Sequence, residues 1–78
     1  MKPEERVRLL RDVGHDVAMS CCILTLDQMR VREVSFRLRQ GEQVIQQVVV
    51  IPLEGPNWEI DRAMHQCIDE VLTRAKLP

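Results

Sequence analysis

The amino-acid sequence predicts an α+β domain, ordered as a helix, a three-stranded antiparallel meander and a second helix, with both helices on one sheet face. Two observations predict it. Apolar residues recur at helical spacing near both ends of the chain, whereas apolar and polar residues alternate between positions 31 and 40. The length of 78 residues suffices for a single domain over residues 1–78 but leaves it a thin core.

The first helix is predicted over about residues 4–17. Val7 and Leu10 are spaced to lie on one side of it, and charged residues fill the other side. Pro3 suits a first helical position because that position needs no backbone N–H donor. Gly14 weakens the end of the helix, although the apolar period continues beyond it.

Three strands are predicted next, and they cover Ala18–Leu26, Val31–Gln40 and Val44–Leu53. Asp27 and Gln28 form a plausible turn between the first two strands. Gly41 lies in a second turn, where a glycine can take positive φ, and Pro52 ends the third strand. These short connections favour antiparallel neighbours.

The last helix is predicted over residues 58–76, with Asn57 as its N-cap. We expect the centre of its apolar stripe to pack against Phe36 and Leu38. The stripe consists of Ile60, Ala63, Met64, Cys67, Ile68, Val71, Leu72 and Ala75.

The third strand is apolar on both of its faces. Ile45, Val49, Ile51 and Leu53 lie on one side and can face the helices. The other side carries Val44, Val48 and Val50, which need another cover. A central strand that tolerates exposed β-branched residues is one interpretation. A second subunit or a partner over these valines is the other, and the short chain favours it. The sequence therefore predicts a homodimer with Val44, Val48 and Val50 in its interface.

The cysteines do not match a metal or redox motif. Cys21 and Cys22 are adjacent, so they point to opposite faces of a strand, and Cys67 lies on the apolar stripe of the last helix. They are expected to be free, reduced thiols that are buried as small hydrophobic residues. The sequence predicts neither a bound metal nor a cofactor.

Carboxylates and a histidine share one side of the last helix. Asp61, His65 and Asp69 follow at intervals of four residues, which resembles half of a general-base arrangement. A solvated ladder of ion pairs is the simpler interpretation, because no nucleophile and no second wall accompany it. The sequence therefore predicts a protein that is not an enzyme.

Five residues are candidates for binding a partner protein: Trp58, Arg62 and His65 on the last helix, and Arg37 and Arg39 on the second strand. An exposed Trp beside an Arg is typical of interface hot spots. Alternatively, Trp58 folds back over the edge of the core, and the arginines form a solvated strand face.

Eleven basic residues against twelve acidic ones give a net charge of −1, which argues against bulk attraction to nucleic acid. The element order resembles that of double-stranded-RNA-binding domains. In that family a basic cluster at the start of the last helix binds phosphates, but the corresponding stretch here, Trp58 to Arg62, is net negative. A nucleic-acid binder that uses its arginine-bearing face is the alternative function.

We expect a small interaction module that acts as an adaptor, regulator or inhibitor of a larger protein assembly. The charged N-terminus and the short apolar runs predict a cytoplasmic location without membrane contact.

Overall fold

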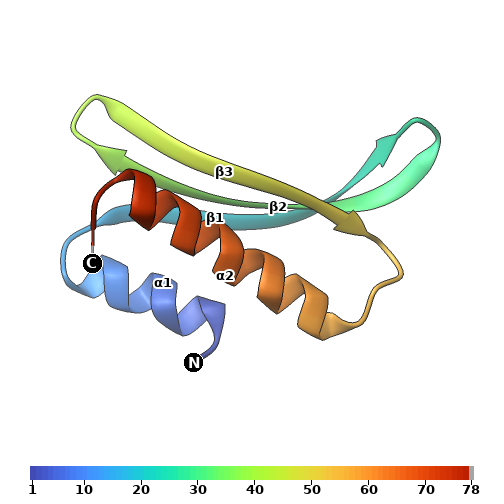
Figure 1. Ribbon diagram of the computed structural model, residues 1–78, viewed down its shortest axis with the longest axis horizontal. Helices are drawn as coiled ribbons and strands as arrows, with labels where there is room; N and C mark the ends of the chain where they lie inside the picture. Colours follow the sequence, from blue (N-terminus) through green and yellow to red (C-terminus); the bar gives the residue numbers. More distant parts are fainter. Residues whose placement is uncertain (78) are drawn as a thin grey trace.

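The computed structural model describes residues 1–77 as two layers, a three-stranded antiparallel sheet and two helices that cover one of its faces (Figure 1). The elements are α1 (Pro3–Asp12), β1 (Asp16–Leu26), β2 (Met29–Gln40), β3 (Gln43–Pro52) and α2 (Asn57–Arg74). The sheet order is β1-β2-β3, and both helices pack against it, so the predicted fold class is confirmed. Pro78, the last residue of the predicted domain, lies outside the described residues.

Two-residue turns join the strands. Asp27 and Gln28 both have positive φ, 48° and 67°, which suits the right-handed twist of a tight hairpin. Gly41 has a φ of 61° in the second turn, as the sequence predicts. Tight turns of this kind fix the pairing register of both hairpins.

The register decides which side chains share a face. Val34 on β2 lies opposite Cys21 on β1 and Val49 on β3. Paired residues point to the same face, and successive residues alternate. The face under the helices, here called the covered face, therefore carries the odd-numbered residues of β1 and β3 and the even-numbered residues of β2. The opposite face is called the open face.

The core forms where the apolar stripe of α2 meets the centre of the covered face. Each fully buried aliphatic or aromatic side chain there contributes about 1.5–3 kcal/mol relative to exposure. The predicted packing of the α2 stripe against Phe36 and Leu38 is confirmed, with Met64 only partly buried at its border. The fully buried side chains are Val34, Phe36, Leu38, Cys67, Ile68 and Val71.

Two predicted helix boundaries are wrong. The first helix ends at Asp12 rather than residue 17, because Gly14 has a φ of 100° and turns the chain into β1. The predicted N-cap of the last helix is also wrong. Asn57 is already the first residue of α2, and Pro56 occupies the cap position without any side-chain hydrogen bond.

The hairpin of β1 and β2 extends beyond the start of α2 (Figure 1). Its tip is consequently exposed on both sides: Ile23 on the covered face is 47% exposed, and Met29 on the open face is 68% exposed. Within residues 1–77, neither helix has the length and apolar character needed to cross a lipid bilayer.

Candidate functional site

The open face carries exposed apolar side chains on its β3 edge. Val44, Val48 and Val50 are 48%, 44% and 48% exposed, whereas Ile45 and Val49 between them pack against the core. The sequence correctly predicts which valines lack a cover from the helices. Their alternation follows from the two-residue period of a strand.

Two predicted binding residues lie on the same face as these valines. On β3, Arg37 is paired with Gln46 and Arg39 with Val44, so both arginines belong to the same sheet face as the valines. Both arginines are exposed. The structure thus brings Arg37 and Arg39 together with the valines of the predicted dimer interface, a grouping that the sequence analysis did not make.

A small polar spot lies in the middle of the open face. The hydroxyl groups of Ser20 and Ser35 are 2.7 Å apart and share a hydrogen bond. Ser35 is only 8% exposed, because it is a small side chain on the central strand with neighbours on both sides. This hydrogen bond satisfies two polar groups on a part of the face that also carries Glu33 and Arg37.

The other predicted binding residues lie on α2, away from the open face. Trp58 is 58% exposed, so the interpretation in which it folds back over the core is wrong. Arg62 is also exposed, and His65 is half-buried. Because α2 packs on the covered face, these three residues and the arginine pair of β2 belong to opposite sides of the molecule.

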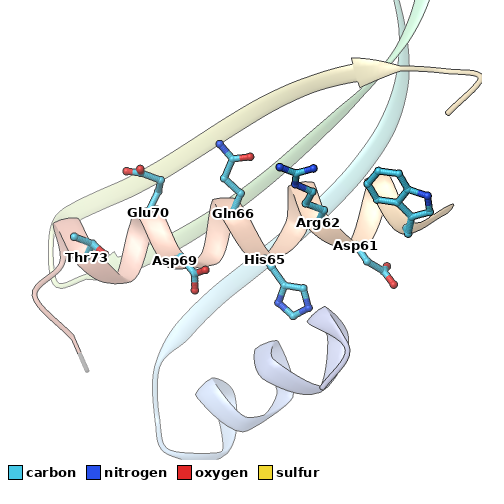
Figure 2. Close-up of a pocket in the computed structure, with 8 residues that line it drawn as sticks. Asp61, Arg62, His65, Gln66, Asp69, Glu70 and Thr73 are labelled. Carbon is cyan, nitrogen blue, oxygen red and sulfur yellow. The ribbon is translucent and has the colours of Figure 1, made fainter. Parts of the chain in front are cut away.

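The ladder of Asp61, His65 and Asp69 is not present as predicted. Figure 2 shows His65 and Asp69 pointing toward α1. Arg6 of α1 reaches across, with one guanidinium nitrogen 3.0 Å from His65 Nδ1 and the other donating to Asp69 Oδ1 at 2.7 Å. The cluster therefore ties the two helices together. No local sequence pattern indicates this role of Arg6, because its contact with His65 spans 59 residues of the chain.

A hollow of about 750 Å³ lies over this side of α2. Figure 2 shows Arg62, Gln66 and Glu70 on the side of the helix that faces away from α1. All residues that line the hollow come from α2 itself, so it is a helix surface without a second wall: Trp58, Asp61, Arg62, His65, Gln66, Asp69, Glu70 and Thr73. Such a surface suits contact with a protein better than enclosure of a small substrate.

A second hollow, of about 720 Å³, lies at the far end of the sheet and is more apolar. Met29 and Val31 of β2 line it together with Val50 and Pro52 of β3. It continues the valine row toward the tip of the first hairpin. The apolar surface that Met29 and Val31 add to the valine row was not predicted, although the alternation of apolar residues at positions 29 and 31 indicates it.

The three cysteines are free thiols in three different environments. Cys67 is fully buried where α2 packs against the sheet, and burial raises the pKa of its thiol because the thiolate would lose its hydration. Cys21 and Cys22 lie on opposite faces of β1, as predicted, but the expectation that they are buried is wrong: both are exposed, because β1 is an edge strand. No group of three or more potential metal ligands occurs within residues 1–77.

The arginines do not gather on one surface. Three are occupied within the fold: Arg6 as described, Arg11 at the Val17 carbonyl and Arg74 at the Gln46 carbonyl. The remaining ones are divided among α1, both faces of β2 and α2: Arg8, Arg30, Arg32, Arg37, Arg39 and Arg62.

No protein-family model matches the chain, and no curated protein or solved structure matches it either.

Proposed function

We propose that this domain is a protein-interaction module that binds a partner protein through its open face. The exposed valine row of β3 forms the centre of the contact, and Arg37 and Arg39 form its charged border. The observation that carries the proposal is that Val44, Val48 and Val50 are each nearly half exposed and lie along the sheet face without a helix, with Gln46 between Val44 and Val48.

The valine row supplies a driving force for association. Complete burial of a valine stabilises by about 1.5–3 kcal/mol, so covering three half-exposed valines supplies roughly 3 kcal/mol. A contiguous apolar patch with a polar rim is typical of interaction surfaces. The arginine border favours a partner with carboxylates at the matching positions, since Arg binds carboxylate in a bidentate manner.

The homodimer predicted through these valines stays a prediction, and it is one form that the proposal can take. In either form the domain acts by binding and not by catalysis. The free thiols support a reducing compartment, so a cytoplasmic location belongs to this proposal.

Affinity capture from the native host tests the proposal. We expect the parent domain to retain a partner protein at moderate salt and after nuclease treatment, and Val48→Lys to lose it. Thr73→Lys adds the same charge on the exposed surface of α2 and serves as the matched control, which should retain the partner. Circular dichroism of each variant confirms that the fold persists.

Two results would contradict this assignment. Retention of the partner by Val48→Lys, or its loss only in Thr73→Lys, would move the contact from the open face to α2. Capture that disappears with nuclease and falls steeply with salt would indicate the nucleic-acid alternative.

A further inference from the structure

Each edge of the sheet has one backbone carbonyl held by an arginine of a helix, but only the β3 edge also contains a proline, Pro52. On the β3 edge, Arg74 of α2 donates to the Gln46 carbonyl at 2.8 Å and to the Gln47 side chain at 2.8 Å. On the β1 edge, Arg11 of α1 donates to the Val17 carbonyl, at 3.2 Å from Nε and 3.1 Å from the terminal nitrogen. Beyond Val17, no side-chain or loop hydrogen bond within residues 1–77 reaches the outer backbone of β1.

The tight turn at 27–28 determines which backbone groups of β1 face outward. In a two-residue hairpin the residues that flank the turn, Leu26 and Met29, form a hydrogen-bonded pair. The even-numbered residues of β1 therefore bond to β2, and the N–H and C=O groups of odd-numbered residues point away from the sheet. The outward carbonyl of Val17, held by Arg11, agrees with this parity.

The unpaired stretch of this edge lacks the usual protection against strand addition. Exposed edge strands usually carry lysine, proline or an inward-pointing charge that prevents another strand from pairing. The ten residues from Val17 to Leu26 contain no charged residue, no proline and no glycine. Asp16 and Asp27 place the nearest charges at either end.

We propose that β1 pairs antiparallel with β1 of a second copy of this chain, so that two sheets join into one sheet of six strands. The outward-facing residues are Met19, Cys21, Ile23 and Thr25, and their midpoint is Cys22. A two-fold axis at Cys22 pairs all four with their counterparts and forms about eight backbone hydrogen bonds. No other register uses the whole unpaired edge.

The same register brings opposite charges together at both ends of the interface. With the axis at Cys22, Val17 lies opposite Asp27 of the second copy. Arg11 already sits at the Val17 carbonyl, so the carboxylate of that Asp27 meets its guanidinium group. The two-fold symmetry repeats this pair of Arg11 and Asp27 at the other end of the interface. The stretch between the two pairs carries no charge and therefore adds no repulsion.

The interface is small but of sufficient size for a specific dimer. A paired stretch of roughly nine residues is about 30 Å long and buries on the order of 1,000 Å² in total, at the lower end for specific interfaces. We therefore expect a dimer that dissociates in the micromolar range. Its two-fold axis is perpendicular to the sheet, so both open faces lie on the same side and form one doubled contact surface.

Cysteine cross-linking tests the register. Cys22 and its counterpart form a non-hydrogen-bonded pair, with Cα atoms about 4.5 Å apart and side chains close together on the open face. A disulfide accepts this separation. Copper phenanthroline with dissolved oxygen removes two electrons and two protons from the two thiols. We expect Cys21→Ser, which keeps Cys22, to form a covalent dimer, and Cys22→Ser to remain a chain of 9.1 kDa.

Sedimentation equilibrium tests the interface itself under reducing conditions. We expect the parent domain to approach twice the mass of 9.1 kDa as its concentration rises. Ile23→Lys places a charge in the pairing edge at a residue that is 47% exposed, so it should give a folded monomer. Val48→Lys on the open face is the control and should still dimerise, which separates this proposal from the proposed function.

Three results would overturn the proposal. A parent domain that stays at the monomer mass up to about 0.5 mM excludes the dimer. Dissociation by Val48→Lys, with Ile23→Lys unaffected, moves the interface to the valine row. Efficient cross-linking through Cys21, with none through Cys22, excludes the two-fold axis at Cys22.

Discussion

The two faces of the sheet have similar residues and opposite environments. Val34 on the covered face is fully buried, while Val48, one strand away on the open face, is 44% exposed. β-branched residues occupy both positions because both belong to strands. The difference teaches that strand propensity selects the residue type, whereas the position of the two helices decides which valines become core and which become available for binding.

Substitution by aspartate should give the largest difference in stability between the covered face and the open face. Val71→Asp places an unpaired carboxylate at a fully buried position between α2 and the sheet, and we expect it to cost at least about 4 kcal/mol. Val50→Asp on the open face should change stability by less than about 1 kcal/mol. Urea denaturation followed by circular dichroism measures both, and a lower midpoint for Val50→Asp than for Val71→Asp would show that the covered and open faces have been exchanged.

Truncation of matched valines gives a finer comparison. Val34→Ala removes two buried methyl groups and should lower the free energy of unfolding by about 2 kcal/mol, including the cavity that remains. Val48→Ala removes the same groups from the half-exposed surface and should cost less than about 1 kcal/mol. A cost for Val48→Ala as large as that for Val34→Ala, at a protein concentration where the chain is monomeric, would contradict the assignment of the open face.

The reactivity of the three thiols tests the same difference between exposed and buried positions. Cys21 and Cys22 should react rapidly with a disulfide reagent in the native protein, and Cys67 should react only after denaturation. A reducing agent should leave the melting temperature unchanged. Three equally fast thiols would show that Cys67 is not buried between α2 and the sheet.

Burial of Cys67 also predicts a dependence of stability on alkaline pH. The pKa of this thiol is raised in the folded state. The stability that the buried, protonated thiol contributes is therefore fully present below its ordinary pKa of 9.0 and is lost as the pH rises further. The decrease is at most about 1.4 kcal/mol per pH unit. Cys67→Ala is the matched variant: the difference in unfolding free energy between it and the parent should shrink above pH 9.0, and a constant difference would argue against the buried thiol.

The smallest expected effect concerns the tether between the helices. Arg6→Ala removes the contacts with His65 and Asp69 and should cost about 0.5–1 kcal/mol, because Asp69 is largely exposed and water weakens the ion pair. Arg62→Ala, on the outward side of α2, is the control and should be neutral within about 0.5 kcal/mol. Identical melting curves for both variants and the parent would show that Arg6 contributes nothing measurable.

Much of the covered face could be predicted because periodicity encodes it locally. Phe36 and Leu38 alternate with polar and charged residues, and the apolar stripe of α2 follows the helical period. These residues become buried once the stripe of α2 packs on that face of β2. The end of α1 could not be placed this way. Val17 continues the apolar period of the helix, yet Gly14 adopts positive φ and Val17 joins the sheet instead.

The candidate sites were harder to predict, because they depend on contacts between distant parts of the chain. The cluster around His65 depends on Arg6, and the protection of the sheet edges depends on Arg11 and Arg74, whose partners no local pattern reveals. The exposure of Trp58 likewise depends on the path of the loop before α2, which the sequence pattern does not determine.

By itself the sequence determined the elements, their order and the apolar set of each strand face, because these follow from side-chain periodicity and turn chemistry within about ten residues. Only the tertiary structure decided where the first helix ends, which backbone carbonyls at the sheet edges the arginines reach and which arginines are already bound. Those outcomes arise from packing and hydrogen bonds between elements far apart in the chain, where the geometry of the whole fold selects the partner of each group.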